Sequence, residues 1–128
     1  MAESSPEIIV ASGPVIIEDG KVLLNKHGED PFWKFPGGRV EDFDMTLEET
    51  AEREVREEMG LEVELIRPLR PMMVKTEDGR VAVLIHYEAK RLNEPAPGVD
   101  IREWGWFPVD DLPTPLAPNI APILDTIK

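Results

Sequence analysis

Three glutamates have the spacing of one helix face, because Glu54, Glu57 and Glu58 occupy positions i, i+3 and i+4. Like charges at this spacing destabilise a helix by roughly 0.2–0.5 kcal/mol per pair. Hard cations such as Mg²⁺ and Mn²⁺ bind carboxylate oxygens and would offset the repulsion. The spacing therefore indicates a divalent metal site, and a glutamate-rich face exposed to solvent is the alternative that the helix alone leaves open.

The segment that carries these glutamates has the start, the stripe and the end of an amphipathic helix. Thr46 and Glu49 form a capping box, in which the two side chains accept hydrogen bonds from backbone amides of the first turn. Apolar residues recur every four positions, at Leu47, Ala51, Val55 and Met59. Gly60 suits a left-handed C-cap. The pattern predicts a helix over residues 47–59.

Strand patterns and turn signals surround the predicted helix. Apolar and β-branched runs predict strands over 8–17, 22–24, 32–35, 62–67, 72–76, 81–87 and 104–108, with a last helix within 118–127. Loops are expected where the sequence is polar or rich in proline, at 25–30 and 93–100. Two Asp-Gly pairs indicate hairpins, at Asp19-Gly20 and, with a type I′ turn, at Asp78-Gly79. Hairpins around an internal helix predict an α+β fold, with the helix packed on the sheet.

The length of 128 residues fits one domain, and no shift in composition divides the chain. The net charge of −12 disfavours nucleic-acid polymers and anionic membranes as partners, because these bind basic patches. The acid is concentrated, with 11 of the 26 acidic residues between Glu41 and Glu64. The absence of cysteine excludes disulfides and thiolate metal sites, and no apolar run approaches the ~20 residues of a membrane helix. We therefore expect a cytoplasmic protein.

Residues 53–61, Arg-Glu-Val-Arg-Glu-Glu-Met-Gly-Leu, match the second half of the Nudix box at every specified position. The whole pattern is G-x5-E-x7-R-E-U-x-E-E-x-G-U, with U aliphatic, and its first glycine corresponds to Gly38. Residues 33–41 resemble the usual lead-in to the box, and residues 110–113 resemble the family's last connection. The chain thus resembles the Nudix hydrolases over most of its length. This implies one domain, an α/β/α sandwich with a mixed sheet, and a loop-helix-loop at about 38–61.

The loop before the predicted helix departs from the Nudix pattern. Counting back from Arg53 puts the first box glutamate at Met45, whereas counting forward from Gly38 puts it at Asp44. The loop is therefore one residue longer than the pattern. Asp44 is the better candidate for the structural carboxylate that braces this loop in relatives.

The resemblance also implies a metal-dependent mechanism. Mg²⁺, or alternatively Mn²⁺, would neutralise a substrate diphosphate and lower the pKa of the attacking water. Arg53 is assigned to orienting the box carboxylates by charge-assisted hydrogen bonds, and Glu57 and Glu58 are assigned catalytic roles. The implied metal ligands are the carbonyl of Gly38 and the side chains of Glu54, Glu57 and Glu58.

The general base is assigned to an acid beyond the box or to a box glutamate. Glu103 is the preferred candidate, because it precedes Trp104 where relatives carry a loop acid, and Asp100 is the alternative. His27 and His86 are expected in surface or core roles instead.

Recognition of a nucleobase needs an apolar platform and a polar group that reads the base edge. In the family's pyrophosphohydrolases of oxidised dGTP, an asparagine in the same proline-rich stretch as Asn119 reads the purine. As a helix N-cap, Asn119 would have the same sequence context, and this role is preferred. The residues expected to contact substrate are Gly37, Arg39, Trp33, Phe35 and Asn119, although the aromatic ones also suit a core.

The resemblance implies hydrolysis of a phosphoanhydride bond in a nucleoside diphosphate linked to another group. The leading expectation is the MutT-type reaction, in which a (deoxy)nucleoside triphosphate gives a monophosphate and pyrophosphate. Cleavage of ADP-ribose or of a dinucleoside polyphosphate is the alternative activity. A non-catalytic Nudix-fold nucleotide-binding module is a further alternative, which the intact box glutamates disfavour. Relatives are commonly homodimers, and no residue pattern marks an interface.

Overall fold

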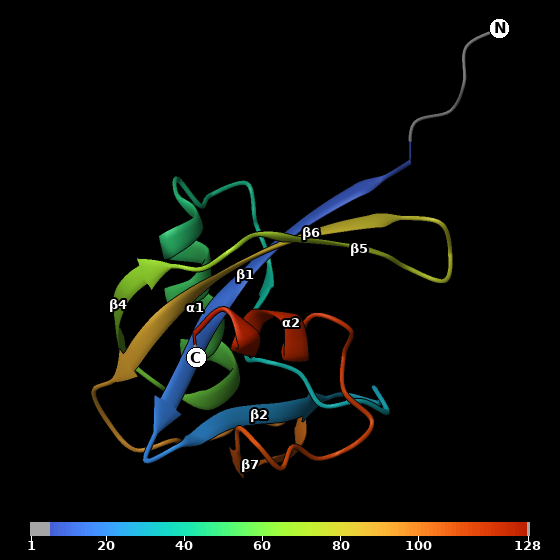
Figure 1. Ribbon diagram of the computed structural model, residues 1–128. Helices are drawn as coiled ribbons and strands as arrows, with labels where there is room; N and C mark the ends of the chain where they lie inside the picture. The colour runs from blue at the N-terminus through green and yellow to red at the C-terminus, as the bar shows by residue number, and fades with distance from the viewer. Residues whose placement is uncertain (1–5, 128) are drawn as a thin grey trace, which may run out of the picture.

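A mixed sheet of seven strands forms the centre of the computed structural model, which describes residues 6–127 (Figure 1). The strands are β1 (Ile8–Glu18), β2 (Lys21–His27), β3 (Gly38–Arg39), β4 (Val63–Pro68), β5 (Met72–Lys75), β6 (Val81–Arg91) and β7 (Ile101–Pro108). Their order is β4-β6-β1-β2-β7, with β3 paired to β1 and β5 paired to β6. Strands β1 and β6 run parallel and the other pairs are antiparallel. The predicted α+β class with a mixed sheet is confirmed.

Strands β1 and β2 send side chains to both faces of the sheet, because successive residues of a strand point in opposite directions. Val15 and Leu24 belong to one core cluster, and Ile16 and Leu23 belong to the other. Helix α1 (Leu47–Met59) contributes to the second cluster, and helix α2 (Ile120–Asp125) contributes to the first. The helices therefore lie on opposite faces of the sheet (Figure 1). Within residues 6–127, neither is long and apolar enough to cross a membrane.

Helix α1 has the bounds that its sequence pattern predicts. Thr46 is the N-cap, and its hydroxyl accepts a hydrogen bond from the Glu49 amide at 3.1 Å. The Glu49 carboxylate accepts from the Met45 amide at 2.6 Å, one residue before the partner of an ideal capping box. Gly60 ends the helix at φ 63°, where its amide donates to the carbonyls of Arg56 and Val55. The glutamate face therefore starts from a fixed helix.

The prediction of a loop at 25–30 is wrong at its start, since β2 continues to His27. Asn25 suggests a loop because it is polar, but its side chain is fully buried and its backbone pairs with Trp104 of β7. Residues 32–35 form isolated bridges rather than the predicted strand. Lys34 pairs with Asn25 on one side, and Trp33 pairs with Leu116 on the other.

The two Asp-Gly turns also differ from expectation. Asp19 and Gly20 have φ of 51° and 76°, which are the positive values that a type I′ turn needs at both central residues. At the second turn only Gly79 is positive, so the predicted type I′ turn is wrong there. The Thr76 hydroxyl bonds the Asp78 carboxylate and accepts from the Arg80 amide, which makes a wider turn. Strands β6 and β7 are longer, and α2 is shorter, than predicted.

Candidate active site

An acidic hollow of about 170 Å³ lies beside the second half of α1. Glu54, Glu57 and Glu58 all line it, so the helix brings together the three carboxylates that their spacing aligns. The opposite wall consists of His27 at the end of β2 and residues 98–101.

Backbone hydrogen bonds hold the opposite wall of the acidic hollow against the end of α1. The Ala96 amide donates to the Met59 carbonyl at 2.7 Å, and the Gly98 amide donates to the Glu58 carbonyl at 2.8 Å. These bonds satisfy carbonyls that the end of a helix leaves without partners. The Asp100 carbonyl accepts from the Gly28 amide at 2.7 Å, which ties the same wall to the end of β2. Asp100 is thereby held at the rim of the hollow.

Glu58 is the most buried carboxylate of the three, with 9% of its surface exposed. Its Oε1 accepts from the Gly37 amide at 3.2 Å and from the Asn25 side-chain nitrogen at 3.5 Å. Burial raises the pKa of Glu58 to about 7, because low-dielectric surroundings disfavour a charge. Burial also raises the pKa of Glu54, which Arg53 opposes. Burial thus disfavours the charged form of both carboxylates.

Arg53 connects the carboxylates of α1 to the preceding loop. Its Nη1 donates to Glu54 Oε1 at 2.8 Å and to Glu57 Oε2 at 3.3 Å. Its Nε and Nη2 donate to the two oxygens of Asp44 at 3.1 and 2.9 Å, and Nη2 also donates to the Arg39 carbonyl at 3.1 Å. A planar guanidinium suits this because its donors form a rigid fork. One side chain therefore sets the orientation of two box glutamates and the loop.

Asp44 has the environment expected of a bracing carboxylate. Its Oδ2 accepts from the Glu41 amide and from the Thr50 hydroxyl, each at 2.9 Å. The hydrogen bonds from Arg53 hold the pKa of Asp44 well below its usual range. The extra residue in the loop is therefore accommodated, since Asp44 still reaches both the loop backbone and α1.

Gly38 lies directly against the Glu54 carboxylate, and a Cβ at this position would overlap with it. The carbonyl of Gly38 and the three carboxylates are the oxygen donors that hard divalent cations prefer. No group of three or more His, Cys, Asp or Glu side chains within residues 6–127 is arranged to hold a metal as it stands. The Glu57 side chain is 59% exposed and has room to turn toward the other carboxylates. The oxygen donors present therefore fit a hard divalent cation.

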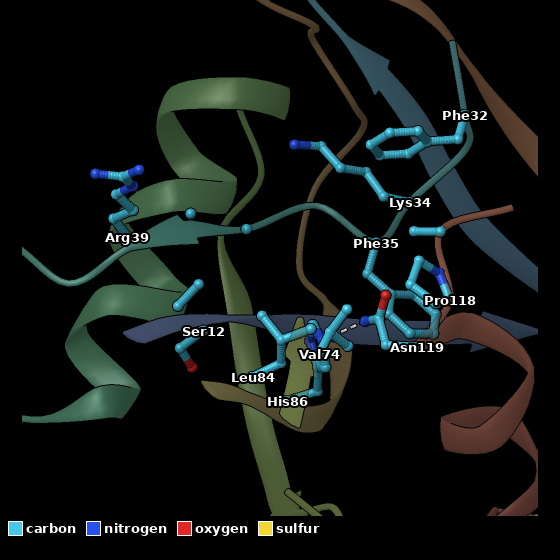
Figure 2. Close-up of a pocket in the computed structure, with 14 residues that line it drawn as sticks. Ser12, Phe32, Lys34, Phe35, Arg39, Val74, Leu84, His86, Pro118 and Asn119 are labelled. Atoms are coloured by element: carbon cyan, nitrogen blue, oxygen red, sulfur yellow. Dashed lines mark hydrogen bonds between the residues drawn. The ribbon is translucent and has the colours of Figure 1, made fainter. Parts of the chain in front are cut away.

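An apolar cavity of about 290 Å³ is lined in part by residues 37–39 (Figure 2). Lys34 and Arg39 lie along one side of the cavity, and Val74, Leu84 and His86 lie along the other. The remaining lining residues are Ala11, Ser12, Phe32, Phe35, Gly37, Gly38, Ala117, Pro118 and Asn119. The cavity is thus mainly apolar, with a few polar groups at defined positions.

Asn119 and His86 form a hydrogen-bonded pair at the wall of the apolar cavity. The Asn119 side-chain nitrogen lies 3.0 Å from His86 Nε2, and His86 Nδ1 lies 3.2 Å from the Gly13 carbonyl oxygen. Asn119 is at the N-cap position of α2, but its side chain makes no capping hydrogen bond. The preferred interpretation of Asn119 as a capping residue is therefore wrong, because its amide binds a buried imidazole instead.

Gly37 and Gly38 connect the apolar cavity to two carboxylates of the acidic hollow. Gly37 and Gly38 line the cavity, yet the Gly37 amide bonds Glu58 and the Gly38 backbone contacts Glu54. Gly37 has φ 152°, and a Cβ there would lie 2.7 Å from the Ser12 carbonyl oxygen. Glycine is required at this position because both the conformation and the space exclude a side chain. A ligand in the cavity could therefore extend over glycine backbone to the carboxylates.

Comparison with known proteins identifies the family. The model of the NUDIX domain matches residues 8–127. The chain belongs to the NUDIX hydrolase family. A MutT-like protein from Streptomyces ambofaciens is 36% identical over 76 residues, which are 59% of this chain and 48% of that protein. The match thus spans about half of that curated relative.

Solved structures resemble the whole Nudix fold of this chain. The MutT NUDIX hydrolase from Burkholderia pseudomallei is 30% identical, with a TM-score of 0.86 over 95% of this chain and 99% of that one. The E. coli ORF135 protein is 23% identical, with a TM-score of 0.77 over 95% of this chain and 89% of that one. The second likeness shows the fold alone.

The Nudix box residues and several expected substrate contacts converge, whereas two expected residues lie elsewhere. Phe35 lines the apolar cavity, whereas Trp33 is buried in the core and packs on Phe107 with ring centroids 4.8 Å apart. Glu103 lies within strand β7 rather than in a loop. Its carboxylate pairs with Lys26 Nζ at 3.3 Å, and it does not line the acidic hollow.

Sequence reasoning did not identify Asn25, Lys34 and His86 as site residues. Asn25 falls in the predicted loop at 25–30, and Lys34 lies in the lead-in at residues 33–41, which assigns it no role. His86 had a usable signal, because residues two apart in a strand share a face and His86 follows Leu84 at that spacing. A polar residue on the apolar face of a strand indicates a specific hydrogen-bond partner.

Proposed function

We propose that this Nudix protein hydrolyses a (deoxy)nucleoside triphosphate to a nucleoside monophosphate and pyrophosphate. The observation that carries this proposal is that Gly37 and Gly38 line the apolar cavity and also contact Glu58 and Glu54 of the acidic hollow. A nucleobase fits the apolar cavity, and a cation-bound diphosphate fits the hollow. The names of the MutT-like and MutT NUDIX hydrolase relatives agree with this reaction.

The metal site that we propose consists of the Gly38 carbonyl, Glu54, Glu57 and Glu58. Mg²⁺, or Mn²⁺, bound there would neutralise the phosphates and lower the pKa of the attacking water. The water oxygen joins one phosphorus, the anhydride P–O bond breaks, and the leaving phosphate keeps the bridging oxygen. Arg53 keeps Glu54 and Glu57 oriented throughout, because it donates to both. The buried Glu58 is fixed by Gly37 and Asn25.

Phosphate binding also needs positive charge on the substrate side of the site. Lys34 and Arg39 both line the apolar cavity, close to the glycines that contact the acidic hollow. The positive charge of Lys34 lowers the pKa of Glu58, so its field reaches the hollow. We assign Lys34 and Arg39 to the phosphates that the cation does not neutralise, and Phe35 and Asn119 to the nucleobase.

We assign the general base to Asp100 rather than to Glu103. Asp100 lines the acidic hollow with the three glutamates, and its backbone is fixed by Gly28. Glu103 is paired with Lys26 and does not line the acidic hollow. In this assignment Asp100 accepts the proton that the attacking water releases.

The proposal is tested by incubating the protein with Mg²⁺ and a nucleotide panel. The panel contains the common ribo- and deoxyribonucleoside triphosphates, ADP-ribose and a dinucleoside polyphosphate, with products followed by phosphorus NMR. We expect pyrophosphate and a monophosphate from at least one triphosphate, and no turnover in EDTA. Isotopically labelled water then identifies the phosphorus that is attacked. Turnover of ADP-ribose alone, or of no compound in the panel, would refute the proposed substrate class.

A further inference from the structure

His86 is a buried side chain that the proposed hydrolysis does not use. Only 6% of its surface is exposed, and its ring packs edge-on against Phe35 with centroids 5.0 Å apart. Its two nitrogens contact different groups, the Gly13 carbonyl oxygen and the Asn119 amide nitrogen. Both contacts are within hydrogen-bond distance, so the imidazole bridges β1 and the turn before α2.

The Gly13 carbonyl decides where the proton of this imidazole lies. A carbonyl oxygen only accepts hydrogen bonds, so Nδ1 of His86 must carry the hydrogen at this contact. Burial lowers the pKa of His86 to about 4, which keeps the ring neutral near pH 7. A neutral ring protonated on Nδ1 has a lone pair on Nε2. Nε2 is therefore an acceptor.

An acceptor at Nε2 permits only one orientation of the Asn119 amide. The nitrogen of the amide donates to Nε2, whereas the flipped amide would place its oxygen against a lone pair. The oxygen then points away from the imidazole, as Figure 2 shows. No residue within 6–127 donates a hydrogen bond to this oxygen, and it is not among the fully buried atoms without a partner. Because Asn119 lines the apolar cavity, a ligand there can reach this oxygen.

We propose that His86 is a positioning residue that locks the Asn119 amide with its oxygen toward the apolar cavity, so that the cavity selects a nucleobase edge carrying an N–H donor. This specificity rests on the proposed nucleotide site, whereas the lock itself exists without any ligand. A base with a lone pair at the same place is repelled by the Asn119 side-chain oxygen, because the hydrogen bond to His86 prevents the amide from flipping. Asn119 contacts the base, and His86 acts through Asn119.

The first test is the protonation state of the ligand-free protein. Nitrogen-15 chemical shifts of the two histidines distinguish the Nδ1-H form of a neutral imidazole from the Nε2-H form, and His27→Asn assigns the signals. We expect His86 as the Nδ1-H form at neutral pH, in the wild type and in Asn119→Leu. An Nε2-H form or a charged ring would overturn the lock. This result does not depend on hydrolysis, so it separates failure of the lock from failure of the proposed function.

The second test compares purine triphosphates that differ in one N–H donor. Adenosine is paired with purine riboside, and guanosine with its O6-methyl derivative, which lacks the ring N–H. We expect the donor-bearing base to be preferred about tenfold in one pair, through KM rather than kcat, because one hydrogen bond contributes about 0.5–1.5 kcal/mol. Monophosphates measured by calorimetry give the same comparison if no triphosphate is cleaved.

A set of single and double variants decides whether His86 is the cause of that preference. His86→Phe removes both contacts, and His86→Asn keeps a donor for the Gly13 carbonyl but is too short to reach Asn119. We expect both variants to lose the preference, as Asn119→Leu does, and the double variant with Asn119→Leu to lose no more. Leu84→Met alters packing on the same wall and should change KM equally for both bases of a pair. A preference that survives in the His86 variants, or is lost in Leu84→Met, would overturn the proposal.

Discussion

The acidic hollow and the apolar cavity are linked by Gly37 and Gly38 but are assembled in different ways. The hollow takes its three glutamates from successive turns of α1. The cavity takes its polar groups from β6, from the segment after β2 and from the turn before α2. One site is therefore encoded by spacing within a helix, whereas the other depends on tertiary structure. Charge dominates the first, and hydrogen-bond orientation dominates the second.

Burial acts on the two regions with opposite results. In the hollow it raises the pKa of Glu58 to about 7, and in the cavity it lowers the pKa of His86 to about 4. Both shifts favour the neutral form, since desolvation disfavours a charge of either sign. A cation would restore the charge of Glu58, whereas His86 is most useful when it stays neutral. Desolvation thus favours cation binding at Glu58 and a directional hydrogen bond at His86.

The largest predicted effects are on kcat for substitutions in the acidic hollow, whereas substitutions in the apolar cavity should change KM. Glu57→Gln and Glu58→Gln remove charge from the hollow and should lower kcat by about a thousandfold or more. Asn119→Leu should instead raise KM by about tenfold, because it removes one hydrogen bond to the base. Steady-state kinetics with the preferred triphosphate measures both, and circular dichroism checks the fold.

Glu52→Gln is the matched control for these glutamate substitutions. It removes the same charge from α1 but lies outside the acidic hollow, so activity should stay within about twofold of the wild type. If Glu57→Gln and Glu58→Gln behaved like Glu52→Gln, the hollow would not be the metal site.

The second prediction tests whether the general base lies in the acidic hollow, at Asp100, or outside it, at Glu103. Asp100→Asn should lower kcat by about a hundredfold, as loss of a general base does. Glu103→Gln removes an equal charge only a few residues away, where the side chain is paired with Lys26. It should change kcat less than about twofold. The opposite ranking would return the base to Glu103 and move the reacting water out of the hollow.

A smaller effect is expected from Arg53→Lys, which keeps the charge but loses the fork that bonds Asp44, Glu54 and Glu57. Substitutions of such supporting residues typically cost about 10–100-fold in metal affinity or activity. The Mg²⁺ concentration for half-maximal rate should rise accordingly. Arg56→Lys is the control, because Arg56 pairs with the exposed Glu62 and should leave that concentration unchanged.

Helix α1 could be predicted from the sequence because its information is local. The spacing of apolar residues, Thr46 and Gly60 fixed its bounds, and the box motif gave the glutamates. Asp44 followed from counting residues in the loop, and its contacts with Thr50 and Arg53 agree with that choice. Each of these features depends on residues close together in the chain.

The apolar cavity could be predicted only in part because its contacts are long-range. The partners of His86 are Gly13, 73 residues away, and Asn119, 33 residues away. The preference of asparagine for helix N-caps predicts a capping role for Asn119, but its side chain contacts His86 instead. Asn25 was missed for a similar reason, since its polar side chain is buried against Glu58 from a different element. Secondary-structure propensity depends on residues that are close in the sequence. The roles of Asn25, His86 and Asn119 depend instead on residues that are distant in the sequence and close in the fold.

The smallest effect is the response of wild-type stability to pH, because the two regions oppose each other. Glu58 has a raised folded pKa, so its contribution to stability is present below its unfolded value of 4.5 and is lost as the pH rises through about 7. His86 has a lowered folded pKa, so its contribution is present above 6.5 and is lost as the pH falls through about 4. Each full contribution is on the order of 3 kcal/mol, and in metal-free buffer they should largely cancel between about pH 7 and pH 5. Urea unfolding of Glu58→Gln should therefore show the loss from His86 alone, about 2 kcal/mol over this range. Equal pH slopes for Glu58→Gln and the wild type would mean that Glu58 is not held neutral by burial, and the contrast between the two regions would then rest on the cavity alone.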